Sequence, residues 1–187
     1  MRLTALITAA AMAIATPIFA AAPMGDDGLH KPDWLRDTFK DMAEDLAEAN
    51  DEGKRMLVIF EQRGCIYCKK MHEEVFPDPD IAALLNDEYF VVQMNLFGDV
   101  EVTDFDGTTL TEKEMARRWG VMFTPTMMFM PESAPAEGTA AQAAVATMPG
   151  AFGKGTTRSL LTWILEKGYE GDEHFQKYVA RKLQETQ

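Results

Sequence analysis

Apolar residues occur along this chain in two patterns, and each predicts a different kind of element. The runs 56–60 (MLVIF) and 89–96 (YFVVQMNL) are almost continuously apolar, as in strands buried on both faces of a sheet. Shorter strands are predicted at 126–130 and 143–150. Helical segments separate the first two strands, so we expect parallel strands joined by a right-handed crossover. The chain is therefore predicted to have an α/β fold.

Apolar residues at helical spacing predict two helices in the first half of the chain. The first begins at Asp33, a typical N-cap residue, and ends near Asn50 and Gly53. The second begins at about Cys65 and ends at Pro77, because proline cannot continue a helix. The apolar stripe of the first helix comprises Leu35, Phe39, Met42 and Leu46.

Further helices and a hairpin are predicted after residue 79. The polar stretch 101–110 has Asp106 and Gly107 at its centre, which suits a hairpin turn. Residues 131–142 are small, polar and proline-bearing, which suits a long loop. The helices expected here are one capped by Asp80, one opened by the capping box of Thr111 and Glu114, one beginning at Thr156 or Thr157, and a last amphipathic one after Asp172.

The first 20 residues have the features of a secretory signal peptide. Arg2 precedes an apolar run without charge, and small residues stand at positions 20–22. We predict cleavage after Ala20, export to the periplasm, and no stable membrane insertion of the mature chain. An uncleaved anchor is the alternative, because the run is long enough to span a bilayer.

The rest of the chain is predicted to contain one domain. The chain is 47% hydrophobic, which supports a packed core, and it shows no internal repeat. We expect a flexible lead over 21–32, a domain over 33–168 and a C-terminal amphipathic helix over 169–187. The formal charge of −12 argues against a nucleic acid or an anionic membrane as partner, since either would repel the protein.

The chain has only two cysteines, Cys65 and Cys68, in the stretch QRGCIYCK. An exported protein can hold them as a disulfide. Such a disulfide would close a loop too short to stabilise the fold much, because the entropy removed from the unfolded chain grows with loop length. A redox role therefore suits this pair better than a structural one.

The predicted position of the pair at the start of a helix assigns a different role to each thiol. Residues three apart in a helical turn lie about 5 Å from each other, within the range that a disulfide accepts. The amides and dipole of a helix N-terminus favour a thiolate at Cys65, by about 0.3–1 kcal/mol when exposed. Arg63, Lys69 and Lys70 add positive charge nearby. Cys65 is therefore the predicted attacking thiol, and the more shielded Cys68 is the predicted resolving thiol.

A metal site is the alternative interpretation of the cysteines. Zinc usually takes four ligands, but no second cysteine pair is present and the histidines, His30, His72 and His174, are scattered. His72 would share a helix face with Cys68, although we predict a solvated position for it. Four methionines near Pro125 offer soft ligands for Cu(I), but at alternating strand positions core packing is favoured: Met122, Met127, Met128 and Met130. We predict no bound metal and keep a periplasmic copper or zinc chaperone as the alternative function.

Several features together resemble the thioredoxin superfamily. They are the strand MLVIF, C-I-Y-C opening a helix, Thr124-Pro125 before a strand, and Gly150 after the last strand. The resemblance covers about residues 33–168 and implies a thioredoxin fold, a central mixed sheet flanked by helices, with extra N- and C-terminal helices. It also implies that Pro125 is a cis-proline beside the cysteines and that the Thr124 backbone pairs with an extended substrate segment. Tyr67 is the third predicted substrate-binding residue.

The chain departs from the thioredoxin pattern at two positions. Arg63 and Gly64 replace the tryptophan before the first cysteine, and Ile59 stands where thioredoxins have a buried acid. Glu61 is a candidate for the proton-transfer role of that acid. The C-x-Y-C motif and the threonine before the proline are more similar to the periplasmic isomerase and reductase branch. The segment 60–76 and the acidic insertion 99–114 resemble exported proteins of sulfur-oxidation (Sox) systems.

The resemblance implies a periplasmic thiol-disulfide oxidoreductase that works in the reducing direction. No cofactor is expected, because the cysteines carry the electrons. The expected partners are disulfide-bearing substrate proteins and a membrane thiol-electron donor, and we expect a monomer because no dimerisation domain is visible. A third possibility is an assembly partner that uses the fold as a binding surface, with the acidic loop and C-terminal helix as its contacts.

Overall fold

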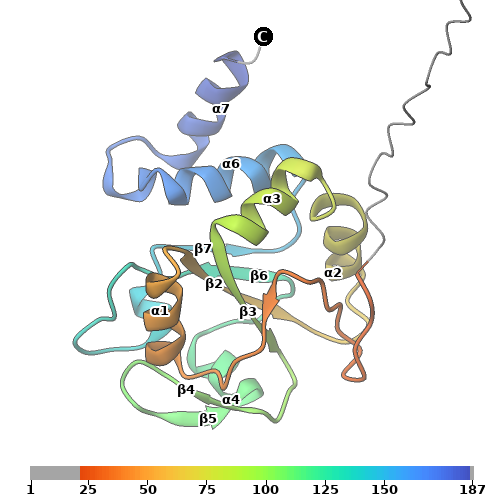
Figure 1. Cartoon of the computed structure of the whole chain (residues 1–187), viewed down its shortest axis with the longest axis vertical. Helices are drawn as coiled ribbons and strands as arrows, with labels where there is room; N and C mark the ends of the chain where they lie inside the picture. The colour runs from red at the N-terminus through yellow and green to blue at the C-terminus, as the bar shows by residue number, and fades with distance from the viewer. Residues whose placement is uncertain (1–21, 186–187) are drawn as a thin grey trace, which may run out of the picture.

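A computed structural model describes residues 22–185 and shows a five-stranded mixed sheet with helices on both faces (Figure 1). The strand order is β1-β3-β2-β6-β7. Strand β3 pairs in parallel with β1 and β2, whereas β2–β6 and β6–β7 are antiparallel. The strands are β1 Leu35–Arg36, β2 Arg55–Glu61, β3 Tyr89–Asn95, β6 Thr126–Phe129 and β7 Ala146–Pro149. The predicted signal peptide, residues 1–20, lies outside the described residues.

Helices α1 and α4 pack on one face of the sheet, and η1, α3 and α6 pack on the other (Figure 1). A separate two-stranded sheet, β4 Glu101–Thr103 with β5 Thr109–Thr111, contains the predicted hairpin. The helices are α1 Met42–Asp51, α2 Ile66–Lys70, the π-helix η1 Met71–Val75, α3 Pro79–Asp87, α4 Glu112–Arg118, α5 Ala140–Ala143, α6 Lys154–Leu165, the 3₁₀-helix η2 Gly168–Glu170 and α7 Phe175–Glu185. No helix among residues 22–185 is long and apolar enough to cross a membrane.

The central strand β2 confirms the prediction of burial on both faces. Successive side chains of a strand point to opposite faces, so Leu57 and Ile59 enter one core and Val58 and Phe60 enter the other. All four are at most 1% exposed. Each such side chain contributes about 1.5–3 kcal/mol by leaving water. Because both faces of β2 are packed in this way, the strand holds the start of the following loop in a fixed position.

The prediction that the first helix begins at Asp33 is wrong. Helix α1 begins at Met42, where the Asp41 carboxylate accepts hydrogen bonds from two helix N–H groups. Residues Leu35–Arg36 add a strand to the sheet edge beside β3, and Lys40 has a positive φ of 58°, which a helix cannot contain. Sheet pairing thus overrides the helical spacing, and Phe39, assigned to the apolar stripe, is exposed. No extra N-terminal helix precedes α1 in the described residues.

Residues 22–32, predicted to be a flexible lead, form a turn against the domain. A bridge joins Met24 to His30, and Leu29 is only 3% exposed. The Arg63 guanidinium donates hydrogen bonds to the backbone oxygens of Asp26 and Asp27. This segment is therefore tied to the loop that carries Cys65.

The C-terminal part contains the predicted elements, but two helix starts differ: α3 has Asp78 rather than Asp80 as its N-cap, and α6 begins at Lys154 rather than at Thr156 or Thr157. The Thr111–Glu114 capping box opens α4, and α7 is the expected last helix, resting on α6 through the buried ring of Tyr178. The loop predicted at 131–142 runs into the short helix α5, and β7 occupies only Ala146–Pro149 of the predicted strand.

Candidate functional site

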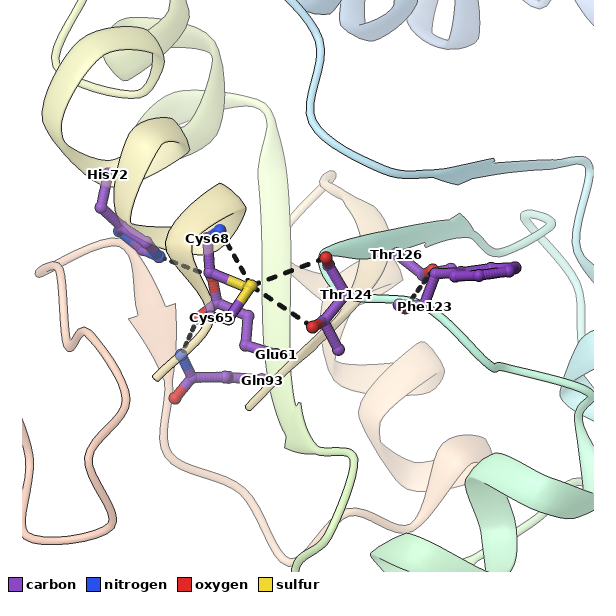
Figure 2. The surroundings of a disulfide bond; sticks show 8 residues. All are labelled: Glu61, Cys65, Cys68, His72, Gln93, Phe123, Thr124 and Thr126. Atoms are coloured by element: carbon purple, nitrogen blue, oxygen red, sulfur yellow. Dashed lines mark hydrogen bonds and ion pairs between the residues drawn. A yellow bond between two sulfur atoms is a disulfide. The ribbon is translucent and has the colours of Figure 1, made fainter. Parts of the chain in front are cut away.

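The two cysteines form a disulfide at the start of a helical segment (Figure 2). Cys65 is the N-cap of α2, and its Sγ accepts a hydrogen bond from the Cys68 N–H at 3.0 Å. Gly64, with a φ of 73°, allows the sharp turn from β2 into this helix. The Cα atoms are 5.2 Å apart, in agreement with the spacing expected for one helical turn. Cys65 is half-buried, whereas Cys68 is buried at 2% exposure.

The loop before β6 brings Thr124 against Cys65, although the two residues are 59 positions apart. The Thr124 backbone oxygen lies 3.5 Å from Cys65 Sγ, and the Thr124 hydroxyl donates to the same sulfur at 3.3 Å (Figure 2). The Thr124–Pro125 peptide bond is cis. The Pro125 backbone oxygen accepts a hydrogen bond from the Gly150 N–H at 2.7 Å, which ties this loop to the end of β7.

Exposed apolar side chains come from the same two segments as Cys65 and Thr124. Together they form what we call the apolar rim: Ile66, Tyr67, Met122 and Phe123, each between 58% and 73% exposed. A hollow of about 270 Å³ adjoins Phe123 and is lined in part by Val121, Met128, Thr147 and Pro149. Large exposed apolar side chains gathered beside a reactive group are typical of a surface that binds another molecule.

Three buried polar side chains are joined by hydrogen bonds, and we call Glu61, His72 and Gln93 the acid cluster. Glu61 Oε1 lies 2.8 Å from His72 Nε2, and Glu61 Oε2 accepts a hydrogen bond from Gln93 Nε2 at 2.6 Å (Figure 2). The three side chains are between 1% and 7% exposed. The prediction of a solvated position for His72 is therefore wrong, because the helix turns this residue inward with Cys68.

Aromatic rings enclose the imidazole of His72. The His30 ring stacks on it at a centroid distance of 4.4 Å, and Phe76 meets it edge-on at 5.0 Å. Trp34 lies nearly parallel to it at 6.0 Å. Burial, with a smaller contribution from His72, lowers the pKa of His30. Of these rings, His30 comes from the N-terminal lead, and Trp34 stands directly before β1.

Most of the acid cluster is not evident from the sequence. Glu61 is a candidate there, whereas Gln93 has no predicted role and His72 is predicted to be in solvent. Two signals were available: Gln93 is a polar residue within a buried strand, and His72 follows Cys68 by one helical turn.

The structure gives no group of three or more His, Cys, Asp or Glu residues within 22–185 that could hold a metal ion. Three of the methionines considered for Cu(I), Met127, Met128 and Met130, are core residues at most 1% exposed, as predicted. Met122 is instead 73% exposed and belongs to the apolar rim. His72, the histidine considered beside Cys68 as a metal ligand, has its Nε2 atom 2.8 Å from Glu61 Oε1.

The fold agrees with comparisons to known proteins. The model of the thioredoxin-like domain family matches residues 42–146, more than half of the chain, and the chain therefore belongs to this family. A search of curated protein sequences finds no match.

Two solved structures are similar in fold over most of their own length. A thioredoxin-fold protein from Helicobacter pylori has 16% sequence identity and a TM-score of 0.57, covering 81% of this chain and 93% of that one. A thioredoxin from Thermus thermophilus has 26% identity and a TM-score of 0.52, covering 68% and 85%. The α/β prediction of a thioredoxin fold with a mixed central sheet is confirmed, whereas the narrower similarity to Sox-associated proteins stays a prediction.

Proposed function

We propose that this protein is a periplasmic thiol-disulfide oxidoreductase that reduces disulfides in other proteins. The observation that carries the proposal is the Cys65–Cys68 disulfide at a helix start, with the Thr124 backbone oxygen 3.5 Å from Cys65 Sγ. A family of thioredoxin-like domains and a pair of cysteines one turn apart both favour dithiol-disulfide exchange. The signal-peptide pattern of residues 1–20 supports the periplasmic location.

In the proposed reaction, the reduced protein gives two electrons to a substrate disulfide. The Cys65 thiolate attacks one substrate sulfur, a mixed disulfide forms, and the other substrate sulfur leaves as a thiolate. Cys68 then loses its proton and attacks Cys65 Sγ, which forms the intramolecular disulfide and releases the second substrate thiol. The N–H of Cys68, which points at Cys65 Sγ, stabilises negative charge on that sulfur.

The buried carboxylate of Glu61 is the proposed proton acceptor for Cys68. It stands at the end of β2, four residues before Cys65, and it is bonded to His72, which lies one helical turn after Cys68. An ionised carboxylate offers about four lone-pair positions, and two here are used by His72 and Gln93. The Glu61 carboxylate therefore has lone-pair positions left that can accept the proton of the Cys68 thiol.

The proposed substrate is an extended protein segment that carries a disulfide. The Thr124 backbone supplies polar pairing next to Cys65, and the apolar rim supplies contacts that do not depend on a particular sequence. The oxidised protein must be reduced again before the next cycle, so the proposal requires an outside thiol donor. We propose that a membrane protein fed from the cytoplasm fills this role.

Two cysteine variants test the function. In an insulin-reduction assay with dithiothreitol, the wild-type protein should speed precipitation of the insulin chains, and Cys65→Ser should lose this activity. Cys68→Ala should trap substrates as mixed disulfides when it is expressed with its own leader and recovered from the periplasmic fraction. Full reductase activity of Cys65→Ser would overturn the proposal, and recovery of the protein only from the cytoplasm would overturn the location.

A further inference from the structure

We propose that His72 is a positioning residue for the second half of the reaction. It holds the Glu61 carboxylate, together with Gln93, where that carboxylate accepts the proton of Cys68. The inference rests on the proposed function and deepens it, because it assigns the resolving step to a buried His–Glu pair.

The position of His72 follows from the helix that carries both cysteines. Residues four apart on a helix are neighbours, with Cβ atoms about 5–6 Å from each other. Cys68 and His72 have this spacing on the continuous segment formed by α2 and η1, and both are 2% exposed. The hydrogen bond between His72 and Glu61 therefore ties the carboxylate to a side chain that neighbours the resolving thiol on the helix.

The hydrogen bonds around Glu61 leave its carboxylate little freedom to rotate. His72 Nε2 engages one carboxylate oxygen, and the Gln93 amide N–H donates to the other. The Gln93 amide is itself oriented, because its oxygen accepts from Lys31 Nζ at 2.7 Å and its nitrogen also donates to the His30 backbone oxygen at 2.9 Å. An ammonium group can only donate, which fixes the NH₂ side of the amide toward Glu61.

An ionised carboxylate can only accept a hydrogen bond, so we place the directed N–H of His72 on Nε2, which faces Glu61. Among residues 22–185, His72 Nδ1 is buried and has no hydrogen-bond partner. The ring is held by stacking on His30 and by the edge of Phe76 rather than by a second polar contact. A side chain that fills this space without the N–H would keep the packing and release one oxygen of Glu61.

The two thiol steps can be observed separately with a small aromatic disulfide, 5,5′-dithiobis(2-nitrobenzoate). Attack by Cys65 on this reagent releases one coloured thiolate, and the attack of Cys68 on the resulting mixed disulfide releases a second. Stopped-flow absorbance with the reduced full-length protein therefore gives one rate for each step.

The matched variants are His72→Leu, which removes the N–H, and His72→Gln, whose amide nitrogen lies near the place of Nε2. His72→Leu should release the first thiolate at the wild-type rate and the second roughly tenfold more slowly, a small part of the effect of general acid–base catalysis. His72→Gln should restore most of the second rate. An unchanged second rate in His72→Leu overturns the inference, as does a His72→Gln variant as slow as His72→Leu, because packing alone would then explain the loss.

A second position tests the inference if circular dichroism shows that His72→Leu does not fold. Gln93→Met removes the other donor to Glu61 while keeping a similar volume. Selective slowing of the second release supports the inference, and two unchanged rates overturn it. Failure of the wild-type protein to release two thiolates would instead overturn the proposed function, so the two failures are distinguishable.

Discussion

The carboxyl group of Asp45 should stabilise the folded protein at acidic pH and lose this contribution at neutral pH, which is the reverse of the usual effect of a carboxyl group. Asp45 lies on the inner side of α1, is 4% exposed, and accepts a hydrogen bond from the Thr38 hydroxyl at 3.0 Å. Burial is the main cause that raises its pKa to about 6, and the nearby carboxylates of Asp41, Glu48 and Glu44 raise it further. The ordinary value is 3.8, so the folded protein binds this proton more tightly than the unfolded chain does.

The difference between these two pKa values sets the size and the sign of the contribution of Asp45 to the free energy of unfolding. A shift of one unit corresponds to about 1.36 kcal/mol, so a rise of about two units corresponds to at most about 3 kcal/mol. Because the folded pKa is the higher one, the stabilising contribution is complete below about pH 4 and is lost as the pH rises through about 6. Ionised Asp45 therefore destabilises the native state at neutral pH.

Replacing Asp45 with asparagine should remove this dependence, because the amide resembles the protonated acid and still accepts from Thr38. We expect Asp45→Asn to unfold at higher urea concentration than the wild type at pH 8, with a gain of about 1–3 kcal/mol, and to differ little at pH 4. The difference between the two proteins cancels the titration of the other carboxylates. Asp51→Asn, the same change at an exposed position of α1, is the matched control and should show no such trend. If the Asp45→Asn effect is the same at pH 4 and pH 8, the reasoning is refuted.

Three further outcomes are expected. Trp34→Ala should lower the free energy of unfolding by about 3–5 kcal/mol in urea titrations, because the buried ring packs on Phe76 and His72; a loss below about 1 kcal/mol would show that these contacts matter little. The double change Tyr67→Ser and Phe123→Ser should raise KM for insulin several-fold and leave the first step with the aromatic disulfide unchanged, and equal effects on both substrates would exclude the apolar rim as a protein-binding surface. Protein purified without oxygen should contain neither copper nor zinc in stoichiometric amount; one metal ion per chain without thiol exchange would favour the chaperone alternative.

The elements that could be predicted from the sequence are those set by local patterns. Strands β2 and β3 were evident because their residues are apolar at nearly every position, which suits burial on both faces. The helix start at Cys65, the Thr111–Glu114 capping box and the Asp106-Gly107 turn depend on contacts within a few residues. The predicted start of the first helix was wrong because it too was based on a local pattern. The residues from Asp33 onward do not by themselves show that Leu35 pairs with β3.

The sequence by itself determined that two thiols stand one turn apart at a helix start after a buried strand. This arrangement depends only on residues that are close together in the chain. Only the tertiary structure decided what surrounds them. It set Thr124 against Cys65 across 59 positions, and it turned His72 and Gln93 inward to hold Glu61. Such contacts depend on how β2, β3, η1 and the loop before β6 pack together, and polar residues like these are usually in water unless distant partners replace their hydrogen bonds.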